Sequence, residues 1–168
     1  TGGGNVNTGT DAGIGFGILT AAVKAGGYIA GPGVVTNSSE EYDGSSWTAG
    51  NNINTARYRL VGLGTQTAAM ALGGRGTPEP QPVVATVENY DGTNWTSGTS
   101  FSTARQSGGG AGTNTAALIC GGGATPVPAG TTNTANSEEW NGTSWTEGNN
   151  MNTTKRAFAG QNGLQTAA

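Results

Sequence analysis

The sequence predicts an all-β protein made of tandem units of about 48 residues, each folded as a four-stranded antiparallel sheet. The string at 40–48, Glu-Glu-Tyr-Asp-Gly-Ser-Ser-Trp-Thr, returns in related form at 88–96 and 138–146. Glycine pairs recur with nearly the same period. No stretch sustains the 3.6-residue apolar period of an amphipathic helix. We therefore expect an array of similar β-units.

Each recurring string predicts a β-hairpin. An aromatic residue ends one strand, a second aromatic residue opens the return strand, and Asp-Gly or Asn-Gly lies between them as a tight turn with positive φ. The aromatic pairs are Tyr42 with Trp47, Tyr90 with Trp95, and Trp140 with Trp145. We expect these rings to fill the gaps between neighbouring units.

Four short strands are expected in each unit. In the second unit they are placed at about residues 59–64, 67–72, 86–90 and 95–96. The first two are made of small residues, and glycine in a strand costs stability unless another backbone must come close. Small inner strands and bulky outer hairpins make a wedge. Four-stranded wedges of about this length, packed around an axis, are the blades of a β-propeller.

The repeat landmarks also divide the chain. Residues 1–8 are the predicted end of a preceding blade, 9–55, 56–103 and 104–153 are three blades, and 154–168 start a fourth. About three and a half copies are fewer than the roughly four to eight blades of a closed propeller. We expect a partial or oligomer-completed propeller, whose partners are further blades of a longer chain or other copies of itself.

A family resemblance rests on the motif words of the second unit. Gly73-Gly74, Glu88, Tyr90-Asp91 and Trp95, followed by Thr103-Ala104-Arg105, resemble the kelch repeat of β-propellers. Gly121-Gly122 and Arg57 repeat parts of that motif. The full phrase is similar to the tandem kelch-like repeats of environmental tailed-phage structural proteins and some bacterial surface proteins. The resemblance covers nearly the whole chain and implies a virion or extracellular structural role.

The end copies depart from this motif. The tyrosine position is Trp140 in the third copy, and the arginine position contains Thr10-Asp11 in the first copy. In the last copy Lys155-Arg156 shifts the arginine by one residue. We expect the recurring arginines to tie neighbouring blades together through carboxylate or carbonyl contacts. Those arginines are Arg57, Arg105 and Arg156.

Composition argues against several function classes. The chain has no histidine, which removes Ser-His-Asp and Cys-His catalysis and imidazole metal sites. Recurring glutamates in separate blades cannot meet on one glycosidic bond, which requires carboxylates within ~10 Å. These glutamates are Glu40, Glu41, Glu88, Glu138 and Glu139. We expect no enzyme, no cofactor and no metal.

Partners are limited by charge and by hydropathy. Seven Lys and Arg residues lie scattered in a chain of net charge −3, so no basic stripe exists for a phosphate backbone. The apolar runs are short and interrupted by glycine, so neither a transmembrane helix nor a signal peptide is expected. We expect no nucleic acid partner and no insertion into a membrane.

Candidate binding loops connect the second and third strands of each unit. All six prolines fall in these connections, which vary most between copies. Loops on a rigid repeat scaffold commonly carry recognition. The candidate residues are Tyr28, Pro32, Pro78, Pro80, Pro82, Pro126 and Pro128. We expect them to share one face with the loops between units; the alternative is that they are only spacers.

The sequence leaves more than one function open. The favoured prediction is a non-enzymatic structural and adhesive module of a virion appendage or extracellular assembly, which binds a cell-surface glycan or receptor through that loop face. The second is a secreted glycan-binding or glycan-processing propeller, which exposed loop aromatics would favour. The third is a cytosolic kelch adaptor.

Overall fold

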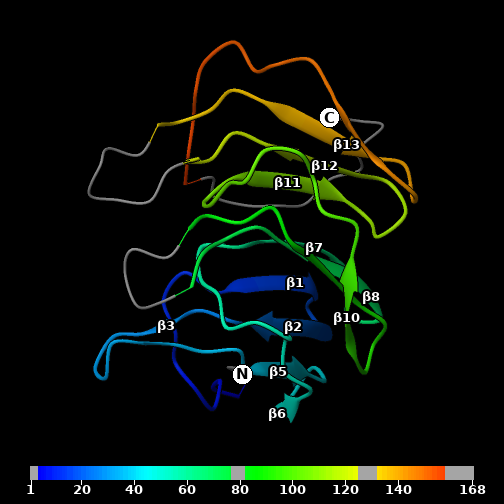
Figure 1. Cartoon of the computed structure of the whole chain (residues 1–168). Helices are drawn as coiled ribbons and strands as arrows, with labels where there is room; N and C mark the ends of the chain where they lie inside the picture. Colours follow the sequence, from blue (N-terminus) through cyan, green and yellow to red (C-terminus); the bar gives the residue numbers. More distant parts are fainter. Residues whose placement is uncertain (1–3, 77–81, 125–131, 158–168) are drawn as a thin grey trace.

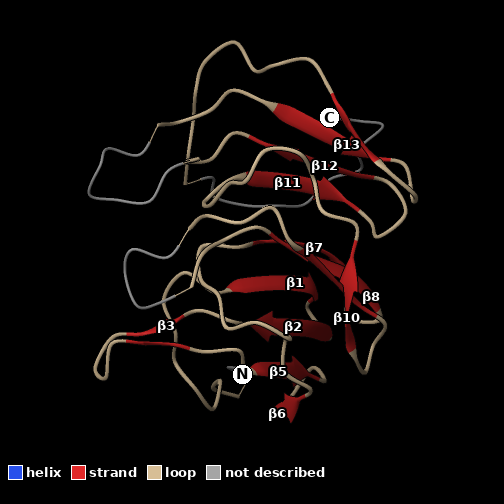
Figure 2. Cartoon of the chain, viewed as in Figure 1, coloured by secondary structure: helices blue, strands red, loops and turns tan. Residues whose placement is uncertain are grey.

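The computed structural model describes residues 4–76, 82–124 and 132–157. Within these residues the chain forms fourteen strands and no helix (Figure 2). Accordingly, this part of the chain contains no helix long and apolar enough to cross a membrane. The prediction of an all-β protein is therefore confirmed over the described residues.

Three four-stranded antiparallel sheets follow one another along the chain, and in each the strands lie side by side in sequence order. The first sheet contains β1 (Ile14–Ile18), β2 (Ala21–Ala25), β5 (Ser39–Tyr42) and β6 (Trp47–Gly50). The second contains β7 (Val61–Thr65), β8 (Ala68–Leu72), β9 (Val87–Tyr90) and β10 (Trp95–Gly98). The third contains β11 (Gly109–Gly112), β12 (Ala117–Cys120), β13 (Ser137–Trp140) and β14 (Trp145–Glu147).

A small hairpin that the sequence did not predict extends the first sheet's connection. It pairs β3 (Tyr28–Ile29) with β4 (Val34–Val35) between β2 and β5. Val34 is half exposed on this hairpin, while Val35 is buried. Tyr28 pairs with Val35 and Ile29 with Val34, around a turn at 30–33.

The three sheets stack so that their first strands, β1, β7 and β11, lie next to one another (Figure 1). One apolar core fills the space between the first and second sheets, and a second core fills the space between the second and third. This arrangement is like that of a β-propeller, and the sheets described here do not close into a ring.

Glycine in the first strands permits this close approach. A Cβ atom on Gly62 of β7 would lie 2.8 Å from the Cβ of Ile14, and one on Gly110 of β11 would lie 2.5 Å from Val61 Cγ1. Real Cβ atoms essentially never come this close. The glycines that weaken these strands in isolation are therefore required by packing between sheets.

The first strand of the second sheet begins later than expected because the residue two positions before it has a left-handed conformation. Arg59 has φ 58° although it is not glycine, so β7 starts at Val61 and not at residue 59. Ala12, Ser107 and Ala157 share this conformation. Their backbones form a ladder from sheet to sheet, in which each N–H donates to the preceding member: Arg59 to Ala12, Ser107 to Arg59, and Ala157 to Ser107.

The outer hairpins begin and end at the predicted aromatic residues, but their loops differ from the expected turns in backbone conformation. Tyr42 pairs with Trp47, so the whole segment 43–46 forms the loop, and only Gly44 in it has positive φ. Asp43 Oδ1 accepts the backbone N–H groups of Ser46 and Ser45, each at 2.8 Å. These two bonds hold the pKa of Asp43 well below its ordinary value. The side chain thus adds to the backbone bond of the turn, in which the Asp43 N–H donates to the carbonyl of Ser46 at 3.2 Å.

Trp95 fills the space between the first two sheets, as the sequence predicts. Its ring is 6% exposed and meets Phe16 of the first sheet edge-on, with ring centroids 6.1 Å apart. It also packs on Tyr90 of its own sheet at 4.7 Å. By contrast, Trp47 and Trp145 are only half buried.

Replacement of Trp95 by alanine should destabilise the protein by about 3 to 5 kcal/mol, because it empties a packed space between two sheets. The matched change Trp47→Ala should cost about 1 kcal/mol, since that ring is half exposed. Urea unfolding followed by far-ultraviolet circular dichroism measures both. A smaller loss for Trp95→Ala than for Trp47→Ala would contradict the packing.

Candidate functional site

A buried glutamate on the third strand of each sheet holds the connection that enters that sheet. Glu40, Glu88 and Glu138 are 3%, 3% and 1% exposed. Glu138 Oε2 accepts the backbone N–H of Ser102 at 2.6 Å, and its Oε1 accepts that of Thr103 at 3.0 Å. Glu88 and Glu40 accept the equivalent N–H groups at 2.6 Å from Asn54 and Asn7. We call each such glutamate and its partners a latch.

An arginine completes the latch in the second and third sheets. Arg105 Nη2 lies 2.7 Å from Glu138 Oε1, and Arg57 Nη2 lies 2.8 Å from Glu88 Oε1. Arg105 also donates to the carbonyl of Asn136 at 2.7 Å. Burial lowers the pKa of both guanidinium groups, and the paired glutamate opposes that shift. A paired guanidinium and carboxylate make a buried charge tolerable.

The backbone of each arginine joins the preceding sheet. The carbonyl of Arg57 accepts the N–H of Gly27, which follows β2, at 2.9 Å. The carbonyl of Arg105 accepts the N–H of Gly74, which follows β8, at the same distance. One residue thus bonds two sheets, through its main chain on one side and its side chain on the other. These contacts are of the kind that the sequence predicts for Arg57 and Arg105.

The first sheet obtains its cation from a different strand. Thr10 stands at the arginine position, and its hydroxyl donates to the carbonyl of Gly26 at 3.3 Å. Lys24 of β2 lies opposite Glu40, with Nζ 3.6 Å from Oε1, and it donates to the carbonyl of Thr8 at 2.8 Å. The equivalent partners of Glu88 and Glu138 are Ala71 and Ile119. Lys24 thus replaces the missing arginine.

The pKa of Glu40 shows how the substitute works. Burial raises this pKa, whereas the N–H groups of Asn7 and Thr8 and the charge of Lys24 lower it, and the net shift is downward. Glu40 is therefore a stable carboxylate at neutral pH. Its two backbone bonds and one cation together exceed the cost of burial.

The structure corrects the arginine assigned to the last copy. Gly122 donates its N–H to the carbonyl of Lys155 at 2.7 Å, so Lys155, and not Arg156, occupies the position of Arg57 and Arg105. Both Lys155 and Arg156 are exposed. We chose Arg156 by residue type, but the backbone register fixes the position.

The other two recurring glutamates, Glu41 and Glu139, lie on different sheets and form no shared site. Glu41 of the first sheet accepts the hydroxyl of Tyr90 of the second, while Glu139 is exposed on the third. Burial raises the pKa of Tyr90, and the bond to Glu41 raises it further. No group of three or more Asp, Glu, Cys or His side chains is placed to bind a metal ion in the described ranges.

The predicted binding loops are described only in part. Pro32 and Pro82 are exposed, whereas Pro78, Pro80, Pro126 and Pro128 lie outside the described residues. Tyr28 is half buried in β3 and packs on Tyr58, with ring centroids 5.8 Å apart.

Our sequence analysis missed Tyr58 as an aromatic residue near these loops. The guanidinium carbons of Arg59 and Arg75 lie 5.3 and 5.4 Å from its ring centroid. The Tyr-Arg pair in the string Tyr58-Arg59 could have suggested a cation–π contact, but Arg75 is distant in sequence. Tyr28 is thus part of an aromatic and cationic cluster, and not an isolated loop aromatic.

One face of the first sheet has the same kinds of residue as the faces that are buried between sheets. Gly15, Ala22 and Tyr42 stand at the positions of Gly62, Ala69 and Tyr90, which are buried against a neighbouring sheet. Gly15 is exposed, and Ala22 and Tyr42 are only half buried. A Cβ atom on Gly15 would approach only the Val23 carbonyl of its own sheet, at 3.9 Å. We call this surface the open face.

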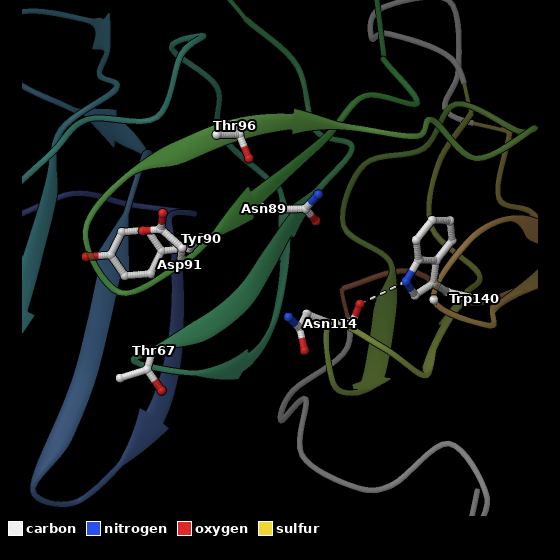
Figure 3. Close-up of a pocket in the computed structure, with 8 residues that line it drawn as sticks. Thr67, Asn89, Tyr90, Asp91, Thr96, Asn114 and Trp140 are labelled. Atoms are coloured by element: carbon white, nitrogen blue, oxygen red, sulfur yellow. Dashed lines mark hydrogen bonds between the residues drawn. The ribbon is translucent and has the colours of Figure 1, made fainter.

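A hollow of about 320 Å³ lies between the second and third sheets (Figure 3). It lies beside the β7–β8 and β11–β12 turns and the outer hairpins, whereas the predicted binding loops connect second to third strands. Most of the lining side chains are polar, and the indole Nε1 of Trp140 donates to the carbonyl of Asn114 at 2.9 Å. The side chains that line it include Thr67, Asn89, Asp91, Thr96, Asn114 and Trp140.

Comparison with known proteins supports the fold. No protein-family model matches the chain, and no curated protein sequence matches it significantly. A solved structure described as the structure of YjhT is similar, with a TM-score of 0.65 and 15% sequence identity. The match covers 79% of this chain and 42% of the YjhT chain, so the present chain spans less than half of that structure. At this identity the likeness concerns the fold alone.

Loss of the Lys24 cation should weaken the first latch. We expect Lys24→Ala to destabilise the protein by about 1 to 3 kcal/mol, because Glu40 keeps its burial without its cation. Adding Thr10→Arg to Lys24→Ala should restore most of that loss, since arginine occupies this position in the other two latches. Urea unfolding at neutral pH measures both variants.

The control is Thr10→Arg in the otherwise unchanged protein, where Lys24 already neutralises Glu40. If Thr10→Arg changes stability by the same amount with and without Lys24, the two residues do not share one role and the proposed substitution is wrong.

Proposed function

We propose that this chain is an array of kelch-like propeller blades, at 9–55, 56–103 and 104–153, that serves as a non-enzymatic structural and adhesive module. The repeated latch supports this proposal, because its recurring acidic and basic side chains join neighbouring sheets. The four-stranded meanders and the glycine pairs after β8 and β12 also suit kelch-like blades. The placement we propose is a virion appendage or another extracellular assembly, and the Thr-, Asn- and Gly-rich composition supports it.

The observation that carries the structural role is the open face. Its equivalent positions are buried twice in the same chain, first against the first sheet and then against the second. Trp47 on this sheet corresponds to Trp95, which is 6% exposed, yet Trp47 is half buried. Covering apolar surface of this kind lowers the free energy of the protein in water.

The occupant we propose for the open face is another sheet of the same repeat. Gly62 and Gly110 accept the Ile14 and Val61 side chains of the preceding sheet. Gly15 leaves the same space beside its backbone. The side chain that would fill this space belongs to an equivalent first strand. That strand comes from a second copy or from further blades of a longer chain.

The adhesive role is assigned to the connections between second and third strands and between sheets. Pro32 and Pro82 are exposed there, on segments whose ends are fixed by the strands of the stacked sheets. Variable loops on a rigid scaffold suit recognition of a receptor or a cell-surface glycan.

Self-association should require the open face. We expect sedimentation equilibrium of the chain to show a concentration-dependent assembly in the micromolar range, and Gly15→Val to weaken it at least tenfold by filling the space beside the backbone of this residue. Gly15 has open space around it and no positive φ, so the melting temperature of the dissociated chain should not fall.

The matched control is Gly31→Val, at an exposed loop position where an added Cβ would have nothing within 4 Å. It should leave association unchanged. A chain that stays monomeric at all concentrations, or a Gly15→Val variant that associates normally, would contradict this use of the open face.

A further inference from the structure

We propose that the hollow between the second and third sheets is a binding site for a small neutral saccharide. The proposal rests on a difference between two equivalent grooves of the same chain. It does not depend on assembly through the open face, which lies on the first sheet.

Side chains of the protein cross the groove between the first and second sheets, and a hollow of about 350 Å³ remains beside Glu41, Asn51 and Thr93. Gln66, in the turn after β7, donates its amide N–H to the carbonyls of Tyr42 at 2.9 Å and Ala22 at 3.3 Å. Glu41 reaches across the same groove to accept the hydroxyl of Tyr90. These two long side chains therefore join the first and second sheets by hydrogen bonds across the groove.

Shorter side chains do not bond across the next groove. Asn114 stands at the position of Gln66, and Asn89 at the position of Glu41, so each is one methylene shorter. Trp140 replaces Tyr90, and its Nε1 bonds to the backbone of Asn114 and not to a side chain on the second sheet. Figure 3 shows the amides of Asn89 and Asn114 between Tyr90 and Trp140.

The lining favours a ligand with hydroxyl groups and no charge. No hydrogen bond with the described residues engages the side-chain amides of Asn89 and Asn114, so both donors and acceptors remain for a ligand. Thr67 and Thr96 add hydroxyls. The Asp91 carboxylate accepts the N–H groups of Asn94 at 2.7 Å and Thr93 at 2.8 Å, which lower its pKa and occupy it within its own turn.

Shape and aromatic content agree with a sugar. A hollow of about 320 Å³ lies at the small end of the ~300 to 1,000 Å³ range of small-molecule sites. Trp140, which is 7% exposed, adds a small apolar surface beside the polar groups, and a sugar ring has both C–H faces and hydroxyl edges. Asp91 is the one carboxylate among the lining residues, whereas glycoside hydrolysis usually employs a pair. The chemistry therefore supports binding without cleavage.

Saturation-transfer difference NMR with a panel of neutral sugars tests the proposal. The panel is glucose, galactose, mannose, N-acetylglucosamine, N-acetylgalactosamine, maltose and lactose, each at millimolar concentration. We expect transfer to at least one sugar with a dissociation constant in the ~0.1 to 10 mM range. Asn114→Gln and Asn89→Glu, which restore the longer side chains that cross the first groove, should each weaken binding at least tenfold, and together abolish it.

The matched control is Asn150→Gln, the same substitution at an exposed position outside the hollow. It should bind as the unchanged protein does, and thermal unfolding of all variants shows that the fold is intact. The proposal is overturned if no sugar in the panel shows transfer, if Asn114→Gln and Asn89→Glu bind normally, or if only anionic compounds such as sialic acid or inorganic phosphate compete for the site.

Discussion

This architecture depends on the hydrogen bonds and ion pair of the buried glutamate on the third strand of each sheet. A carboxylate inside a protein is costly unless it is hydrogen-bonded and paired with a cation. Glu88 and Glu138 meet that requirement only when the incoming connection supplies its N–H groups and an arginine. The connection is thus fixed before it reaches the first strand. The sheets can then approach closely enough for glycine to be needed at Gly62 and Gly110.

The repeated geometry tolerates changes of residue where another residue supplies the same interaction. Lys24 replaces an arginine from a different strand, so the first latch keeps a cation although Thr10 cannot provide one. The grooves between sheets tolerate change in a different way. Shortening Gln66 to Asn114 at the equivalent position does not break the array, but the side-chain amide no longer bonds across the groove. Comparison of equivalent positions in one chain therefore distinguishes the contacts that hold the fold from the residues that are available for function.

The sequence was sufficient to predict the period, the sheets and the outer aromatic residues, because these depend on spacing and local turn chemistry. It identified Arg57 and Arg105 for the same reason. It could not identify Lys155 or Lys24, whose roles depend on backbone register and on a partner in another strand. It also missed the hollow beside Trp140, because that space arises from a size difference across two sheets. The late start of β7 depends on a left-handed residue, Arg59, that no residue preference indicates.

The latch is tested most directly by hydrogen exchange at the amides that it holds. Asn54, Ser102 and Thr103 lie in connections between strands, where exposed amides normally exchange quickly. If buried glutamates fix these connections, their amides should exchange only through global unfolding, with the same free energy as Met70 in the core strand β8. Exchange of these amides at the rate of an exposed loop amide such as that of Asn52 would contradict the account.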